Sequence, residues 1–129
     1  MGYLSGYDNL ELIAQIKGVA TPEDIRSALR LVGFDADEKK KFRAYSLGMK
    51  QRLGIAAAIM EKPKLLVLDE PTNALDEAGV EMLKRVVAMA ALTGREVILS
   101  SHDGEVLEEL ADRVYCMRDG AVVKVRERS

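Results

Sequence analysis

Apolar residues recur at helical spacing through the first half of the chain. They predict a helix over residues 8–17 that ends at a glycine, and a second helix that begins at Thr21 and ends at Gly33. Thr21 can cap the second helix because its side-chain oxygen can accept a hydrogen bond from a free backbone N–H. Ser46 should begin a third helix that continues to about Met60. The first half of the chain is therefore expected to be all-helical.

After Met60 the pattern changes to short apolar strands that alternate with helices. The continuous run Leu65–Leu68 is typical of a parallel strand covered on both faces. Asp119 and Gly120 should form the turn of a final hairpin. The other elements expected, in chain order, are a helix from Asp76 to Gly94, a strand over 96–101, a short helix over 104–111, and strands over 114–117 and 121–125.

Two carboxylates follow directly after the Leu65–Leu68 run. Asp69 and Glu70 stand at the carboxyl end of the predicted strand, and Pro71 stops it. Ligands of open α/β sheets bind at such ends, and neighbouring carboxylates suit a magnesium nucleotide. One carboxylate would face the metal and the other an attacking water. An ordinary strand that ends in a solvated acidic turn has the same pattern, so two further segments decide between these interpretations.

These segments lie on either side of the acidic pair. Residues 45–56 are YSLGMKQRLGIA, residues 65–76 are LLVLDEPTNALD, and residues 98–102 are ILSSH. In this order they closely resemble the signature motif, the Walker B motif with its D-loop, and the switch histidine of ATP-binding-cassette (ABC) ATPases. The form YSLGM in place of LSGGQ is similar to that of bacterial drug- and bacitracin-resistance exporters. Residues 3–18 also look like the start of the helical subdomain in that group.

The resemblance implies an α/β fold with a partial RecA-like (P-loop NTPase) parallel sheet preceded by an ABC-type helical subdomain. It divides the chain into residues 1–62, the helical subdomain with the signature motif, and residues 63–129, the C-terminal half of the catalytic core. The Walker A pattern G-x-x-x-x-G-K-[ST], which holds the phosphates of the nucleotide, does not occur in the 129 residues. The chain therefore resembles the C-terminal portion of such an ATPase. In the family, the strand that precedes the phosphate loop's helix lies beside the switch-histidine strand, and the 129 residues lack it. We therefore expect uncovered sheet surface and self-association.

The same resemblance implies three roles at the ends of the strands. Asp69 would bind Mg²⁺ directly or through water, and Glu70 would be the general base for the attacking water. His102 is the only histidine. A lone histidine is normally structural or solvated, but at the end of a strand beside the acidic pair it could hydrogen-bond the γ-phosphate and the water.

Four more residues match motifs that act across a dimer. Ser46 and Gly48 belong to the signature, which implies contact with ATP bound to the other subunit of a head-to-tail dimer. Asn73 and Asp76 match the D-loop, which couples the two sites. Taken alone, Ser46 and Asp76 would be helix caps and Gly48 a packing requirement.

Composition narrows the class of partner. Charged residues make up 31% of the chain and the formal net charge is −2, which favours neither nucleic acid nor an anionic membrane surface. No apolar stretch is long enough to insert into a bilayer, so a cytoplasmic location is expected. Cys116, the single cysteine, lies in an apolar strand pattern typical of a buried, inert thiol. Met60, Met82 and Met89 are expected in the core.

The function implied is that of a C-terminal fragment of an ABC transporter ATPase. In its intact form the enzyme would use ATP and Mg²⁺ to drive small-molecule transport, with export the expected direction. Its partners would be a transmembrane subunit and a second ATPase subunit, identical or not, placing it against the inner face of the cell membrane. The isolated chain is predicted to be inactive without Walker A. One alternative is a non-catalytic interaction fragment that pairs with an intact ATPase or the membrane subunit, and another is a truncated or engineered piece with no role of its own.

Overall fold

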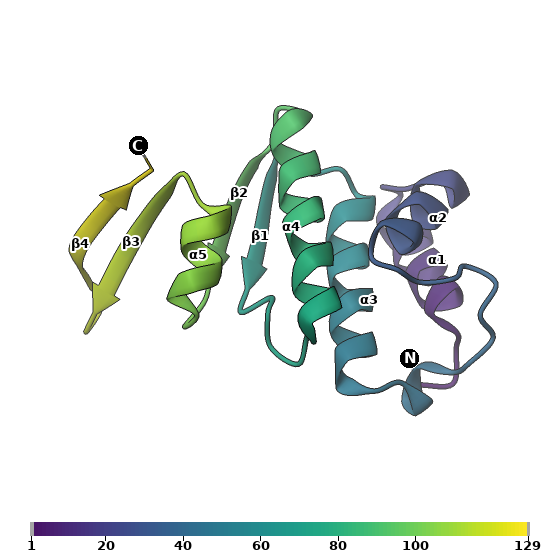
Figure 1. The fold of residues 1–129 in the computed structure, drawn as a ribbon. Coiled ribbons are helices and arrows are strands. Elements are labelled where there is room, and N and C mark those ends of the chain that lie inside the picture. The colour runs from purple at the N-terminus through teal and green to yellow at the C-terminus, as the bar shows by residue number, and fades with distance from the viewer. Residues whose placement is uncertain (1, 129) are drawn as a thin grey trace.

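A computed structural model describes residues 2–128. Helices gather at one end, a further helix lies between them and a small sheet, and a hairpin lies at the other end (Figure 1). The elements in chain order are α1 (Gly6–Lys17), α2 (Pro22–Leu31), the 3₁₀ turn η1 (Phe42–Ala44), α3 (Leu47–Met60), β1 (Leu65–Asp69), α4 (Glu77–Leu92), β2 (Glu96–Ser100), α5 (Gly104–Leu110), β3 (Arg113–Arg118) and β4 (Ala121–Glu127).

Local signals set the helix ends, and α1 begins at Gly6, two residues before the predicted start, because Ser5 caps it. Gly18 follows α1 with φ 66°, a left-handed conformation that glycine adopts without strain. Thr21 and Asp24 form a reciprocal capping box at the start of α2. The backbone N–H of Thr21 lowers the pKa of Asp24 to about 2, and Lys62 also forms an ion pair with this carboxylate at 2.9 Å. The ionised Asp24 thus links α2 to the segment that follows α3.

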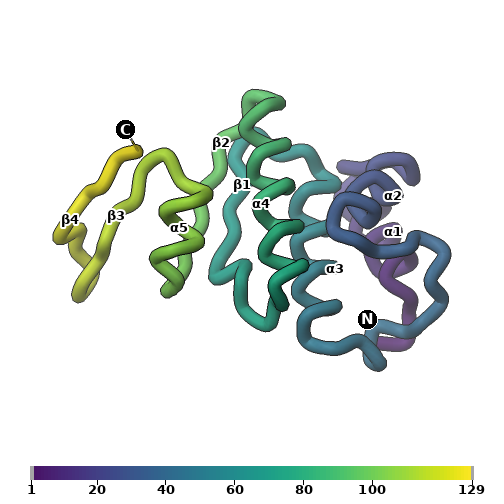
Figure 2. The backbone as a smooth tube through the Cα atoms, viewed as in Figure 1, coloured from purple at the N-terminus to yellow at the C-terminus, as the bar shows by residue number. Residues whose placement is uncertain are grey.

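The segment between α2 and α3 returns to the start of the chain. It runs along the outer side of the helical end and passes close to the first residues (Figure 2). The N–H of Phe42 donates to the carbonyl of Leu4 at 2.8 Å, and the N–H of Arg43 donates to that of Gly2 at 2.9 Å. The connection between α2 and α3 therefore contains a short 3₁₀ turn tied to the N-terminal residues.

One hydrophobic core connects the helices to the sheet. Side chains with at most 1% exposure come from α1, α2, α3 and α4 and include Leu10, Ile25, Leu29, Met60, Met82, Leu83 and Val86. Leu66 and Leu68 of β1 belong to the same cluster. The expected burial of Met60 and Met82 is confirmed. That of Met89 is wrong, because this side chain on α4 is 51% exposed.

We expect Leu83→Ala to lower the free energy of unfolding by about 2–5 kcal/mol, because it opens a cavity at a position with 0% exposure. The matched control is Leu92→Ala, the same substitution on the same helix at a position 83% exposed. It should change stability by less than about 0.5 kcal/mol. Urea unfolding of both variants measures the difference, and equal losses would contradict the core assignment.

The sheet is parallel, as the apolar runs predict. β1 pairs with β2 in the register that sets Leu65 opposite Glu96 and Asp69 opposite Ser100. Leu66 and Leu68 are buried against the helices, whereas Leu65 is 46% and Val67 61% exposed. The expectation that β1 is covered on both faces is therefore wrong, because helices cover one face and nothing among residues 2–128 covers the other.

The uncovered face supports the predicted self-association of the isolated chain. Val67 and Ile98 lie there with 61% and 57% exposure, and apolar surface of this kind favours association. Sedimentation over a range of concentrations should show oligomers that Val67→Lys shifts towards monomer. Leu92→Lys, which changes an exposed leucine on α4, should leave the oligomers intact. A monomer at every concentration would contradict the expectation.

The C-terminal hairpin forms as predicted. Asp119 and Gly120 have φ values of 51° and 79°, as a two-residue turn between twisted strands requires. β3 and β4 pair antiparallel, and every residue of β4 is exposed. Cys116 on β3 is a free thiol that is half-buried rather than buried.

No helix among the described residues is long and apolar enough to cross a membrane.

Candidate functional site

The candidate site lies where β1 and β2 end. Asp69 is the last residue of β1, and Glu70 follows with φ 47°, in the left-handed region that non-glycine residues rarely adopt. The N–H of Glu70 donates to the carbonyl of Ser100 at 3.0 Å, which holds the turn against the end of β2. Strained backbone of this kind costs about 1–3 kcal/mol and is typical of functional sites.

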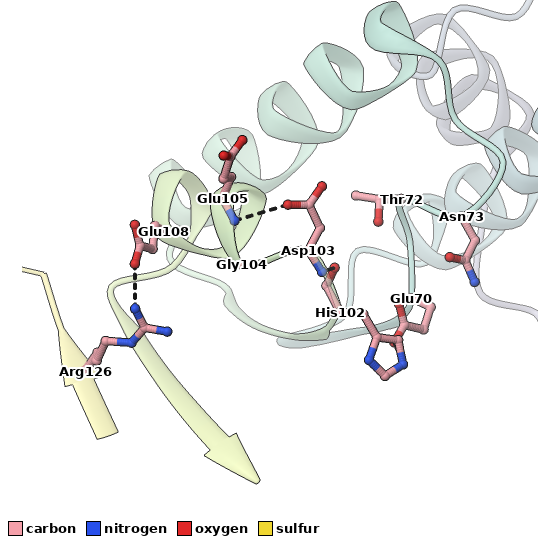
Figure 3. Close-up of a pocket in the computed structure, with 10 residues that line it drawn as sticks. Glu70, Thr72, Asn73, His102, Asp103, Gly104, Glu105, Glu108 and Arg126 are labelled. Atoms are coloured by element: carbon pink, nitrogen blue, oxygen red, sulfur yellow. Dashed lines mark hydrogen bonds and ion pairs between the residues drawn. The ribbon is translucent and has the colours of Figure 1, made fainter. Parts of the chain in front are cut away.

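Glu70 and His102 face each other across the sheet edge. His102 Nε2 lies 3.1 Å from Glu70 Oε1, and the side chains are 97% and 24% exposed, respectively. Figure 3 shows the two side chains together, one from the turn after β1 and the other from the loop after β2. Parallel pairing brings the carboxyl ends of β1 and β2 together, and His102 therefore lies beside Glu70, as the sequence predicts.

An open hollow of about 690 Å³ extends from this pair. Thr72 and Asn73 line it on the side of the β1 turn, and Asp103 and Glu105 line it at the start of α5 (Figure 3). Farther from the pair, Arg126 forms an ion pair with Glu108 at 2.7 Å. The hollow thus contains three of the predicted site residues: Glu70, Asn73 and His102.

Asp69 is held by a residue that sequence analysis did not select. The hydroxyl of Ser100 donates to Asp69 Oδ1 at 2.5 Å, and Ser100 Oγ also accepts the N–H of Glu70 at 3.0 Å. Ser100 lies within the ILSSH segment, but its contact with Asp69 depends on the register of two strands. That register could not be read from the sequence.

The donors present fit Mg²⁺ rather than a metal bound by protein alone. Within residues 2–128 no three His, Cys, Asp or Glu side chains are grouped to hold a metal ion. Asp69 and Glu70 supply two carboxylates, and Mg²⁺ is typically held by one or two carboxylates together with substrate phosphates and water. A nucleotide would therefore have to complete the metal's ligands.

Ser46 and Gly48, the predicted signature residues, lie at the start of α3. Ser46 caps this helix, since its Oγ accepts the N–H of Met49 at 3.1 Å. Gly48 lies against the D-loop: a Cβ there would be 2.8 Å from the carbonyl oxygen of Ala74. Neither residue lines the hollow around Glu70 and His102. The structure thus places the predicted signature residues against the predicted D-loop but apart from the acidic pair.

The segment from Pro71 to Asp76, which includes the predicted D-loop, is fastened to α3 from two sides. Gln51 Nε2 donates to the carbonyl of Pro71 at 3.0 Å, and Arg52 lies 3.5 Å from Asp76 Oδ1. Asp76 also caps α4 by accepting the N–H of Gly79 at 2.8 Å. Asp76 therefore acts as a helix cap, independently of the predicted role in coupling the two sites of a dimer.

Comparison with known proteins identifies the family of this chain. The model of the ABC transporter family matches residues 2–73, more than half of the 129-residue chain. The protein belongs to the ABC transporter family.

Two relatives are bacterial transport proteins. The bacitracin transport ATP-binding protein BcrA of Enterococcus faecalis is 41% identical over 122 residues, which are 94% of this chain and 40% of the relative. The lantibiotic transport ATP-binding protein SrtF of Streptococcus pyogenes is 38% identical over 124 residues, which are 96% of this chain and 54% of the relative. The chain thus spans about half the length of the curated relatives it matches.

Solved structures confirm the fold. The dimeric ABC transporter cassette MJ0796 superposes with a TM-score of 0.86 at 23% identity, covering 98% of this chain and 58% of that one. An ATP-binding subunit of an ABC transporter superposes with a TM-score of 0.85 at 25% identity, covering 98% of this chain and 54% of that one. The α/β architecture with its parallel sheet is therefore that of an ABC cassette, as the resemblance implied.

Proposed function

We propose that this chain carries the hydrolytic groups of an ABC transporter ATPase whose intact form couples ATP hydrolysis to small-molecule transport, with export as the direction. The observation that carries the proposal is the Glu70–His102 pair, 3.1 Å apart at the ends of paired parallel strands. The bacitracin transport named for BcrA and the lantibiotic transport named for SrtF support a role in transport. The transported molecule would be recognised by the separate membrane subunit.

Glu70 is the proposed general base. Its Oε1 is engaged by His102, so Oε2 is the atom that would accept a proton from an attacking water. His102 is almost fully exposed and can turn its imidazole towards the γ-phosphate and that water once nucleotide fills the hollow. The pair would position the water, remove its proton and keep it in line with the phosphorus.

Asp69 is the proposed metal-binding residue. Its carboxylate is exposed at the sheet edge, and its Oδ1 is fixed by Ser100, which leaves Oδ2 for the metal or for a metal-bound water. When bound, Mg²⁺ would neutralise charge on the nucleotide's phosphates.

Ser46, Gly48, Asn73 and Asp76 are proposed to act across a dimer with a second ATPase subunit. Ser46 is exposed at the N-terminus of α3, a helix of 14 residues, where backbone N–H groups favour an anionic phosphate. Contact between Gly48 and the carbonyl of Ala74 joins this signature to the D-loop. A movement of the signature would therefore shift the D-loop, and a movement of the D-loop would shift the signature.

We further propose the division into a helical subdomain, residues 1–62, and a catalytic portion, residues 63–129. A transmembrane subunit would bind the assembled ATPase, placing it in the cytoplasm against the inner face of the membrane. The 129 residues contain no Walker A sequence, so ATP binding requires that loop from another polypeptide segment. The test is hydrolysis by a cassette reconstituted from this chain and a segment of a relative that carries the loop.

A further inference from the structure

One hydroxyl group lies between the two acidic residues of the site. Ser100 is the last residue of β2 and is the register partner of Asp69. Its Oγ donates to Asp69 Oδ1 at 2.5 Å and accepts the backbone N–H of Glu70 at 3.0 Å. The side chain of one acid and the backbone of the next are thus tied to a single atom.

This arrangement fixes the direction of the hydroxyl. A serine hydroxyl has one proton to donate, and the N–H of Glu70 approaches from the acceptor side. The proton is therefore directed to the Asp69 carboxylate, forming a charge-assisted hydrogen bond of the short kind. The backbone carbonyl of Ser100 accepts the same Glu70 N–H at 3.0 Å, so the serine holds the turn with two of its atoms.

Asp69 depends on this bond for its orientation. Its side chain is exposed, and among residues 2–128 no other donor hydrogen-bonds its carboxylate. Without the hydroxyl, the carboxylate could rotate freely in water. The bond leaves Oδ2 without a hydrogen-bond partner among residues 2–128.

We infer that Ser100 is a positioning residue that orients Asp69 for a divalent cation and fastens Glu70 in its left-handed backbone conformation. The inference rests on the proposed function, in which Asp69 holds Mg²⁺. Partners that hydrogen-bond metal ligands typically change metal affinity by about 10- to 100-fold when they are removed. Ser100 would act through Asp69 without touching the metal.

Two variants of nearly equal shape isolate the hydroxyl. Ser100→Thr keeps the oxygen, whereas Ser100→Val replaces it with a methyl group, and both β-branched side chains suit a strand. Ser100→Ala removes the oxygen without adding bulk and serves as the second deletion variant. The matched control is Ser101→Val, because Ser101 Oγ accepts the N–H of Asp103 at 2.9 Å and has no bond to Asp69.

The measurements use NMR on the full chain. The ¹³C resonance of the Asp69 carboxyl reports its hydrogen bonding, and broadening of the amide signals of Asp69 and Glu70 by Mn²⁺ reports the cation. Ser100→Thr and Ser101→Val should match the wild type in both. Ser100→Val and Ser100→Ala should shift the carboxyl resonance and raise the Mn²⁺ midpoint about tenfold.

The outcomes separate this inference from the function on which it rests. If Ser100→Thr and Ser100→Val have the same Asp69 carboxyl resonance and the same Mn²⁺ midpoint, Ser100 does not position Asp69. If only the thermal midpoint of unfolding differs between them, the serine is merely structural and the inference is overturned. If Mn²⁺ leaves the wild-type signals sharp, the chain holds no cation without nucleotide, and the carboxyl resonance alone decides whether Ser100 orients Asp69.

Discussion

Glu70→Gln should lower ATP turnover of the reconstituted cassette by about two orders of magnitude or more, while ATP binding is retained. Glutamine keeps the size of the side chain and can still contact His102, which lies 3.1 Å from Glu70 Oε1. It cannot accept the proton of the attacking water. Nucleotide should therefore remain bound and unhydrolysed, which steady-state phosphate release and a filter-binding assay measure together.

The matched control for this variant is Glu105→Gln. Glu105 lines the same hollow from the start of α5, and its substitution removes the same charge. It should hydrolyse ATP at close to the wild-type rate, because the carboxylate is not the one paired with His102. Near-full turnover by Glu70→Gln would show that Glu70 is not the base.

Ser46→Arg should prevent ATP from holding two subunits together. In the reconstituted cassette with Glu70→Gln, trapped ATP should produce a dimer that sedimentation detects. Adding Ser46→Arg to this cassette should abolish the dimer. The reason is steric: Ser46 is exposed at the N-terminus of α3, and a long side chain there would fill the space needed by the partner's phosphates.

Loss of the helix cap must be separated from this steric effect. Ser46 Oγ accepts the N–H of Met49, and any substitution that removes this bond costs about 1 kcal/mol. Ser46→Ala loses the cap but adds no bulk, so its ATP-dependent dimer should weaken without disappearing. If Ser46→Arg dimerises as well as Ser46→Ala, the signature does not face the partner's nucleotide.

Features set by neighbouring residues could be predicted from the sequence. Capping by Thr21, Ser46 and Asp76 needs only a side chain within three residues of the N–H it accepts. The meeting of Glu70 and His102 could also be predicted, since each follows a parallel strand of the same sheet. These predictions depended on chain order and not on tertiary detail.

Features set by what covers an element could not be predicted. Val67 and Met89 lie in patterns typical of buried strands and helices, yet they are 61% and 51% exposed. Half-buried Cys116 has the same explanation, because periodicity shows which residues share a face and not what packs on it. Ser100 was missed for a related reason: the register that sets it opposite Asp69 is fixed by pairing between distant segments.

Phosphate release by the reconstituted cassette tests the central claim most directly, since the claim is that this chain supplies the hydrolytic groups and lacks the phosphate-binding loop. The account predicts no Mg-ATP hydrolysis and at most weak ATP binding by the chain alone, none by the loop-bearing segment alone, and hydrolysis when the two are refolded together. Rapid hydrolysis or sub-micromolar ATP binding by the chain alone, or a refolded pair that binds ATP and never releases phosphate, would contradict it.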